Sequence, residues 1–169
     1  MGYWGYYVVG RSERPLAELA AVAGVRDELS LLDRRPDGWQ VWEVPGGGDG
    51  ARDIGNMNTL ARETDAPALF GYVMDSDCVV VEAAAPRSGS WTTCLARGAM
   101  AKYLGDAELT VEDYFLEPRD AAQRAVAWAA ESGRTVSSGP LLDVLKADAE
   151  PSAEELFFRL LDRLGVVPQ

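Results

Sequence analysis

The chain contains no histidine, and this absence excludes more functions than any other feature of its composition. Ser-His-Asp triads, Cys-His pairs and the HExxH zinc helix all need an imidazole, which is also the usual acid–base group near neutral pH. Cysteine is almost as scarce, because only Cys78 and Cys94 occur and their spacing is not that of a CxxC pair. We therefore expect reduced core thiols, no bound metal and no cofactor.

Long apolar segments are missing as well. No stretch approaches the roughly 18 uncharged apolar residues that a membrane-spanning helix requires. Residues 1–7 have neither the basic region nor the apolar region of a signal peptide. These two observations predict a cytoplasmic protein that does not bind membranes.

Positive charge is in short supply. The chain has 27 acidic and 16 basic residues, a net charge of −11 and a pI near 4.4. Phosphate backbones are repelled by such a chain, so we expect no binding to nucleic acid. The charge suits either solubility or a basic partner, and both interpretations stay open. The basic residues are nearly all arginine and alanine is abundant, which indicates a GC-rich bacterial genome.

What is present is the composition of a folded domain. Of 169 residues, 47% are hydrophobic and 25% are charged, which is typical of globular proteins. We predict a single α+β domain over residues 1–169. Residues 1–85 would form an antiparallel or mixed sheet of about five strands, and residues 86–169 a helical half that shares the same core.

The first half alternates between strand and helix patterns. The predicted strands are residues 3–9, 28–32, 39–44, 68–74 and 78–84. A helix from Pro15 to Gly24 would join the first two strands, and a helix from Ala51 to Thr64 would join the third and fourth. The first six elements of this β-α-β-β-α-β-β order match a ferredoxin-like split βαβ unit, which would place both helices on one face of the sheet.

The second half is predicted to be helical. We expect helices from about Ser90 to Gly105, from Pro118 to about Ser132, and over a short segment after Pro140. A last helix follows Ser152, which forms the pattern of a capping box with Glu155.

Sequence motifs for common chemistry are not found. The glycine-rich loop Gly46 to Gly50 lies between a strand and a helix, where phosphate-binding loops occur, but it has neither GxGxxG nor GxxxxGK[ST] spacing. Asp49 and Asp53 would also place negative charge where a phosphate should lie, so we interpret the loop as a flexible link. No GxSxG or SxxK nucleophile motif occurs.

Three carboxylates are the candidate catalytic residues: Asp75, Asp77 and Glu82. An Asp-x-Asp pair can hold magnesium, but Asp and Ser are equally typical of a hairpin turn. Alternation along the strand places Glu82 on the same face as Cys78, Val80 and Ala84. If that face is buried, the pKa of Glu82 should rise and the carboxyl could serve as a general acid or base. A solvent-facing position or an arginine partner is the alternative.

The segment from Gly105 to Asp120 interleaves acidic and aromatic side chains. The candidate partner-binding residues in it are Asp106, Glu108, Glu112, Asp113, Tyr114, Phe115 and Glu117. Acidic groups around an exposed aromatic anchor can dock on a basic protein surface. The alternative is a solvated connector whose aromatic rings face the core.

The function we expect is non-catalytic: an acidic bacterial module that binds another protein, with a basic partner favoured by charge. Small acidic inhibitors of the immunity or antitoxin kind resemble the chain in size, charge and lack of catalytic groups, and this analogy implies an inhibitor of a basic partner. Two alternatives stay open. One is a magnesium-dependent hydrolase or transferase that uses the three carboxylates. The other is a small-ligand-binding domain with an aromatic pocket formed by Tyr3, Tyr7, Trp39 and Trp42.

Overall fold

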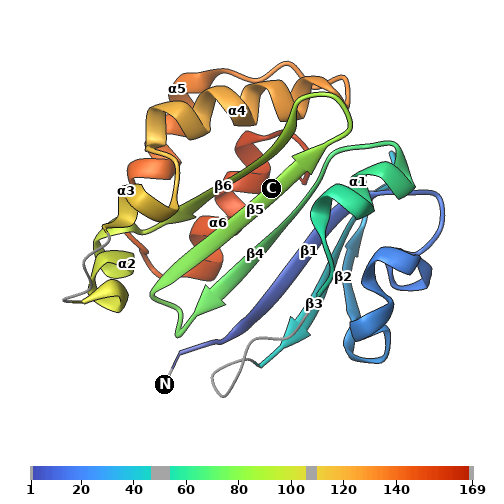
Figure 1. The fold of residues 1–169 in the computed structure, drawn as a ribbon, viewed down its shortest axis with the longest axis horizontal. Helices are drawn as coiled ribbons and strands as arrows, with labels where there is room; N and C mark the ends of the chain where they lie inside the picture. The colour runs from blue at the N-terminus through green and yellow to red at the C-terminus, as the bar shows by residue number, and fades with distance from the viewer. Residues whose placement is uncertain (1, 47–53, 106–109, 168–169) are drawn as a thin grey trace.

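The sheet is built around a strand that is buried on both faces. The computed structural model describes residues 2–46, 54–105 and 110–167. Its strands are β1 (Gly5–Arg11), β2 (Ser30–Arg34), β3 (Trp39–Pro45), β4 (Ala68–Met74), β5 (Cys78–Ala85) and β6 (Gly89–Leu95). All neighbours pair antiparallel in the order β2-β3-β1-β4-β5-β6 (Figure 1).

The first four strands have the order of a split βαβ unit. Strands β1 and β2 run parallel to each other with β3 between them, and β4 lies on the other side of β1. The predicted α+β fold with an antiparallel sheet is therefore confirmed. The sheet has six strands, one more than predicted.

The additional strand is β6, and the predicted helix from Ser90 is wrong over this segment. Trp91, Thr93 and Leu95 are buried, whereas Ser90 is exposed. Cys94 is buried as well, so burial does not alternate strictly, and the pairing of Gly89–Leu95 with β5 is what fixes this segment as a strand. Helix α2 (Arg97–Leu104) begins only after Ala96, whose positive φ of 58° turns the chain. The sheet thus extends past residue 85 into the half predicted to be helical.

One face of the sheet carries the short helices of the first half. These are η1 (Leu16–Glu18), η2 (Ala20–Glu28) and α1 (Met57–Thr64), and their buried side chains belong to one cluster. The predicted helix from Pro15 to Gly24 is instead a pair of 3-10 segments interrupted by the extended residue Leu19. The β-branched Val22 and Val25 have non-helical φ and ψ, which shortens each segment to a turn. The prediction that both connections lie on one face is confirmed.

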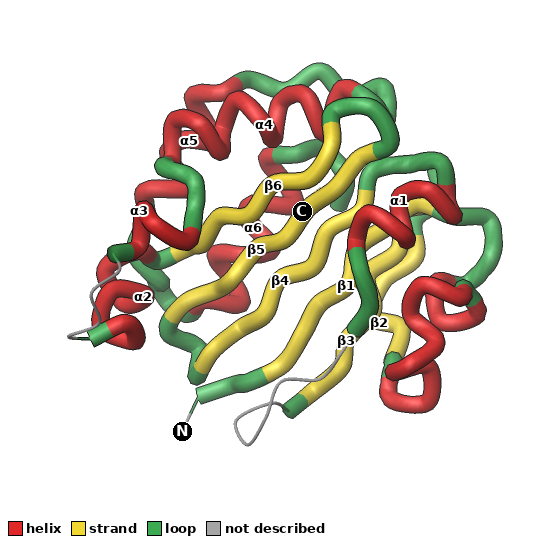
Figure 2. Tube along the Cα trace, in the orientation of Figure 1, coloured by secondary structure: helices red, strands yellow, loops and turns green. Residues whose placement is uncertain are grey.

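The other face is covered by helices from the second half. These are α4 (Pro118–Ala130), α5 (Ser138–Lys146) and α6 (Ala153–Arg163), and the sheet lies between the two helical layers (Figure 2). The predicted cap of the last helix is present, since Ser152 Oγ accepts a hydrogen bond from the Glu155 N–H. No helix in the three described ranges is long and apolar enough to cross a lipid bilayer.

Glu131, directly after α4, holds that helix to the β5–β6 turn. Its carboxylate accepts hydrogen bonds from the Arg87 N–H, the Ser88 N–H and the Ser88 hydroxyl. Burial disfavours the charged form, but the hydrogen bonds from Ser88 and Arg87 outweigh it and lower the pKa of Glu131 below its ordinary value of 4.5. The ionised carboxylate therefore stabilises the fold.

We expect Glu131→Gln to lower the free energy of unfolding by about 1 kcal/mol at pH 7. Because the pKa of Glu131 is lower in the folded state, its contribution is present above the unfolded pKa near 4.5 and is lost as pH falls through the folded value. Denaturant unfolding of both proteins between pH 7 and pH 3 measures this. The two curves should converge in acid, and a difference that is constant with pH would contradict the assignment.

Candidate functional site

The acidic-aromatic segment is attached to the open edge of β6. It contains the short helix α3 (Val111–Tyr114) and the residues that lead into α4. The Leu116 N–H donates to the Thr92 carbonyl at 3.0 Å, and the Thr93 hydroxyl donates to the Leu116 carbonyl at 2.9 Å. These bonds continue the sheet by one residue and fix the segment against a rigid strand.

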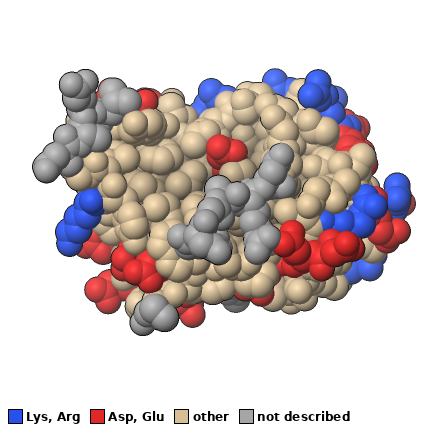
Figure 3. Space-filling view, turned by 60° about the horizontal axis from the view of Figure 1, so that its bottom comes forward, with Lys and Arg blue, Asp and Glu red and all other residues tan. Residues whose placement is uncertain are grey.

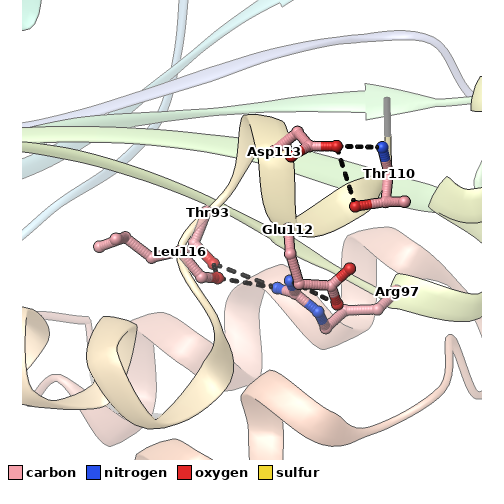
Figure 4. Close-up of polar contacts among 6 residues, drawn as sticks. All are labelled: Thr93, Arg97, Thr110, Glu112, Asp113 and Leu116. Atoms are coloured by element: carbon pink, nitrogen blue, oxygen red, sulfur yellow. Dashed lines mark hydrogen bonds and ion pairs between the residues drawn. The ribbon is translucent and has the colours of Figure 1, made fainter. Parts of the chain in front are cut away.

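Arg97, the first residue of α2, strengthens this attachment (Figure 4). Its side chain is only 16% exposed. Nη1 donates to the Leu116 carbonyl at 3.0 Å, and Nη2 lies 3.7 Å from Glu112 Oε1. One guanidinium thus holds the backbone of the segment and partly neutralises the charge of Glu112.

The segment turns its side chains in two directions. Tyr114 is 49% exposed, and Glu112, Asp113 and Glu117 are exposed. Phe115 is half-buried and packs on the core, so Tyr114 is the better candidate for an aromatic anchor. The predicted residues Asp106 and Glu108 lie outside the described residues.

Asp113 has a local structural role. Its Oδ2 accepts hydrogen bonds from the Thr110 N–H at 2.6 Å and from Thr110 Oγ1 at 3.1 Å, which caps α3 (Figure 4). The Thr110-x-x-Asp113 spacing is the signal in the sequence that indicates this cap, and we did not predict it.

The segment and β6 enclose a hollow of about 600 Å³, named here the acidic hollow. Its lining residues are Ser90, Trp91, Thr92, Glu112, Asp113, Tyr114, Phe115, Leu116, Glu117, Asp120 and Arg124. Four of these are carboxylates, and the one cation among them, Arg124, donates to the backbone carbonyls of Ser88 and Ser90. Such a lining attracts cationic groups.

The surface of the protein carries charges of both signs. Figure 3 shows a face on which acidic and basic side chains both lie mainly toward the margin, with an acidic group also near the middle. Local arrangement, and not the net charge of −11 alone, therefore decides where a cation would bind.

The turn Asp75-Ser76-Asp77 has structural partners. Asp75 Oδ1 accepts from the Gly2 N–H at 2.8 Å, and Asp77 Oδ2 accepts from the Tyr103 hydroxyl at 3.3 Å. Asp75 and Ser76 both have positive φ, as in a tight hairpin turn. The two carboxylates thus hold neighbouring segments in place.

Glu82 lies apart from these two aspartates. Glu82 comes five positions after Asp77 in the sequence, a distance of about 16 Å along a strand. The described residues contain no group of three or more acidic or cysteine side chains that could hold a metal ion. The structure therefore does not bring Asp75, Asp77 and Glu82 into one magnesium site. Glu82 is exposed, yet partial burial among its neighbours raises its pKa.

The four aromatic residues proposed for a ligand pocket do not meet. Tyr7 and Trp39 belong to the core under α4 to α6, whereas Trp42 packs against the core on the opposite face of the sheet. Tyr3 stacks on Tyr7 at 5.6 Å and donates from its hydroxyl to Glu43 Oε2 at 2.6 Å. Burial raises the pKa of Tyr7 to about 12. These rings are packed against protein groups and not arranged around a cavity.

Both cysteines are free and buried, as predicted. Burial raises the pKa of Cys78 to about 12 and that of Cys94 to about 11, the latter despite the opposing charge of Arg97. Thiols with such pKa values are poor nucleophiles at neutral pH.

Comparisons of the chain with protein-family models, curated proteins and solved structures find no match. The functional argument therefore depends on the geometry of the acidic hollow.

Proposed function

We propose that the chain is a non-catalytic protein-binding module that acts in the cytoplasm on a basic partner, in the manner of a small acidic inhibitor. The observation that carries this proposal is the acidic hollow, whose lining includes four carboxylates and the exposed Tyr114. An exposed aromatic anchor supplies contact area, while the surrounding carboxylates accelerate encounter with a basic surface. Attachment to β6 supports the proposal, because a preorganised site loses little conformational entropy on binding.

A fluorescein-labelled hexaarginine peptide is a suitable probe for this site. Association measured by stopped flow should slow by at least about tenfold between ~0.05 M and ~0.5 M salt, because screening weakens electrostatic steering. The site variant keeps the Asp113 cap and removes three other charges: Glu112→Gln, Glu117→Gln and Asp120→Asn. It should raise the Kd about 5- to 30-fold, as expected for three exposed ion pairs.

A control variant removes the same number of charges elsewhere: Glu13→Gln, Glu18→Gln and Asp27→Asn, all at exposed positions near η1 and η2. Its Kd should change by less than about threefold, because each charge lies outside the contact. Tyr114→Ala should raise the dissociation rate more than it changes association. Equal weakening by the two triple variants would mean that only net charge matters, and the acidic hollow would be rejected as the binding site.

A further inference from the structure

Glu82 has no partner among the residues that the structure describes, in contrast to Glu131 and Glu63. Among the described residues it makes no hydrogen bond and no ion pair. Glu131, in contrast, accepts from Arg87 and Ser88, and Glu63 accepts from two backbone N–H groups of η2. The negative charge of Glu82 is therefore uncompensated within the protein.

The side chains around Glu82 are mainly apolar. Its neighbours on the same sheet face are Phe70 on β4, Thr92 on β6, and Val80 and Ala84 along β5. Three of these four are apolar, and the fourth offers a hydroxyl. A carboxylate placed among apolar groups without a counter-ion is stabilised when a cation reaches it.

A hollow of about 520 Å³, named here the Glu82 hollow, gives access to this carboxylate. The start of α1 forms one wall through Asn56 and Asn58, and β6 forms the other. Residues Ser90, Trp91 and Thr92 line both the Glu82 hollow and the acidic hollow. Because neighbouring strands are about 4.8 Å apart, a short extended segment can cross β6 from one hollow to the other.

The exposure of the Glu82 hollow to solvent favours a cationic side chain of a bound partner over a free cation. Glu82 and Ser90 are exposed, so a small free cation in this hollow would keep much of its contact with water. Exposed ion pairs contribute little by themselves, and such a cation would bind weakly. A cationic side chain on a segment already bound at the acidic hollow has a high effective concentration at Glu82 and needs little intrinsic affinity.

We propose that the basic partner of the acidic hollow also extends across β6 and inserts one lysine or arginine side chain into the Glu82 hollow, where it pairs with the Glu82 carboxylate. This inference rests on the proposed function and assigns a second anchor to the same partner. It makes strand β6 the centre of the interface, with an acidic contact on each side.

The test compares Glu82→Gln with Glu18→Gln, which removes the same charge at an exposed residue of η1. Glu82→Gln should raise the Kd for the hexaarginine peptide by about fivefold or more, and Glu18→Gln by less than about twofold. Glu82→Gln should fold normally, because its carboxylate makes no interaction that the variant would lose. A thermal melt of each variant verifies this before binding is measured.

NMR separates failure of this inference from failure of the proposed function. On addition of hexaarginine, the Asn58 amide signals should report on the Glu82 hollow and the Tyr114 amide on the acidic hollow. In Glu82→Gln, the shift of Asn58 should vanish while that of Tyr114 remains.

If the two single variants bind equally and Tyr114 still shifts, the Glu82 anchor is wrong and the proposed function stands. If neither residue shifts in the unmodified protein, both proposals are wrong. A final titration uses n-butylguanidinium alone. If it binds as tightly as hexaarginine and depends on Glu82, the hollow is a small-molecule site and the partner side chain is rejected.

Discussion

Replacing Phe157 with alanine is expected to lower the free energy of unfolding by about 3–5 kcal/mol, the range found when a fully buried aromatic ring is removed. Phe157 is completely buried on α6, and its ring stacks on Tyr7 at 5.7 Å with an interplanar angle of 13°. The ring also lies directly over Gly71 of β4, where a Cβ would be 2.5 Å from Phe157 Cε1. The missing side chain at Gly71 is what lets α6 pack this close to the sheet.

Gly71→Ala adds volume at the same contact instead of removing it. It should lower the free energy of unfolding by about 2–3 kcal/mol, because the new methyl group displaces the ring of Phe157. In a Phe157→Leu background the same substitution should cost less, since the shorter side chain relieves the clash. Gly98→Ala in α2 is the matched control. A Cβ there meets nothing within 4 Å, so the variant should be neutral or slightly more stable. Denaturant unfolding of these variants and of the unmodified protein measures the differences, and an unaffected Gly71→Ala protein would show that the ring of Phe157 does not pack against Gly71.

Trp128→Ala should lower the free energy of unfolding by a comparable amount, about 3–5 kcal/mol. Comparison with Trp128→Phe separates the contribution of apolar packing from that of the indole hydrogen bonds. Trp128 is completely buried on α4, 5.7 Å from the ring of Trp39. Its Nε1–H donates to the carbonyls of Ala68 at 3.1 Å and Ala84 at 3.0 Å, so that one indole joins β4 to β5.

Phenylalanine keeps most of the apolar contact of Trp128 but removes this donor. Trp128→Phe should lower the free energy of unfolding by about 1–3 kcal/mol, the penalty for leaving buried carbonyls without their hydrogen bond. Calorimetry on the unmodified protein, Trp128→Ala and Trp128→Phe measures the differences in the free energy of unfolding. Equal stability of Trp128→Phe and the unmodified chain would show that the ring, and not its N–H, is what matters.

Local sequence patterns predicted most of the sheet, because the alternation of a strand and the residue preferences of a turn each depend on only a few consecutive residues. The strand from Ala68 to Met74 was predicted with its observed ends, and Asp75 to Asp77 was predicted as a turn. The helix predicted from Ser90 was wrong because the spacing of Trp91, Leu95 and Ala99 is compatible with a helix as well as with a strand. Pairing with β5 decides between the two, and that contact is not visible in the segment itself.

The candidate site was predictable in its composition but not in its geometry. The acidic-aromatic segment could be recognised by its residues, but the attachment of Leu116 to Thr92 and the contact with Arg97 depend on how β6 lies beside it. Alternation predicted that Glu82 shares a face with Cys78, Val80 and Ala84, but Cys78 belongs to the core under α4 to α6 and Ala84 to the core on the opposite face. A solvent-facing position was one of the alternatives left open for Glu82, and the side chain is exposed beside the start of α1.

The turn between β4 and β5 has a consequence for how the chain folds. Ser76 accepts hydrogen bonds from the N–H groups of Tyr3 and Ala153, and its own N–H donates to the Tyr3 carbonyl. Residues from the beginning, middle and end of the sequence thus meet at one point. Contacts between such distant residues close large loops, so they form late and slow the search for the native state. The final docking of α6 and the ordering of the residues before β1 should therefore occur together, as one cooperative event and not as successive local steps.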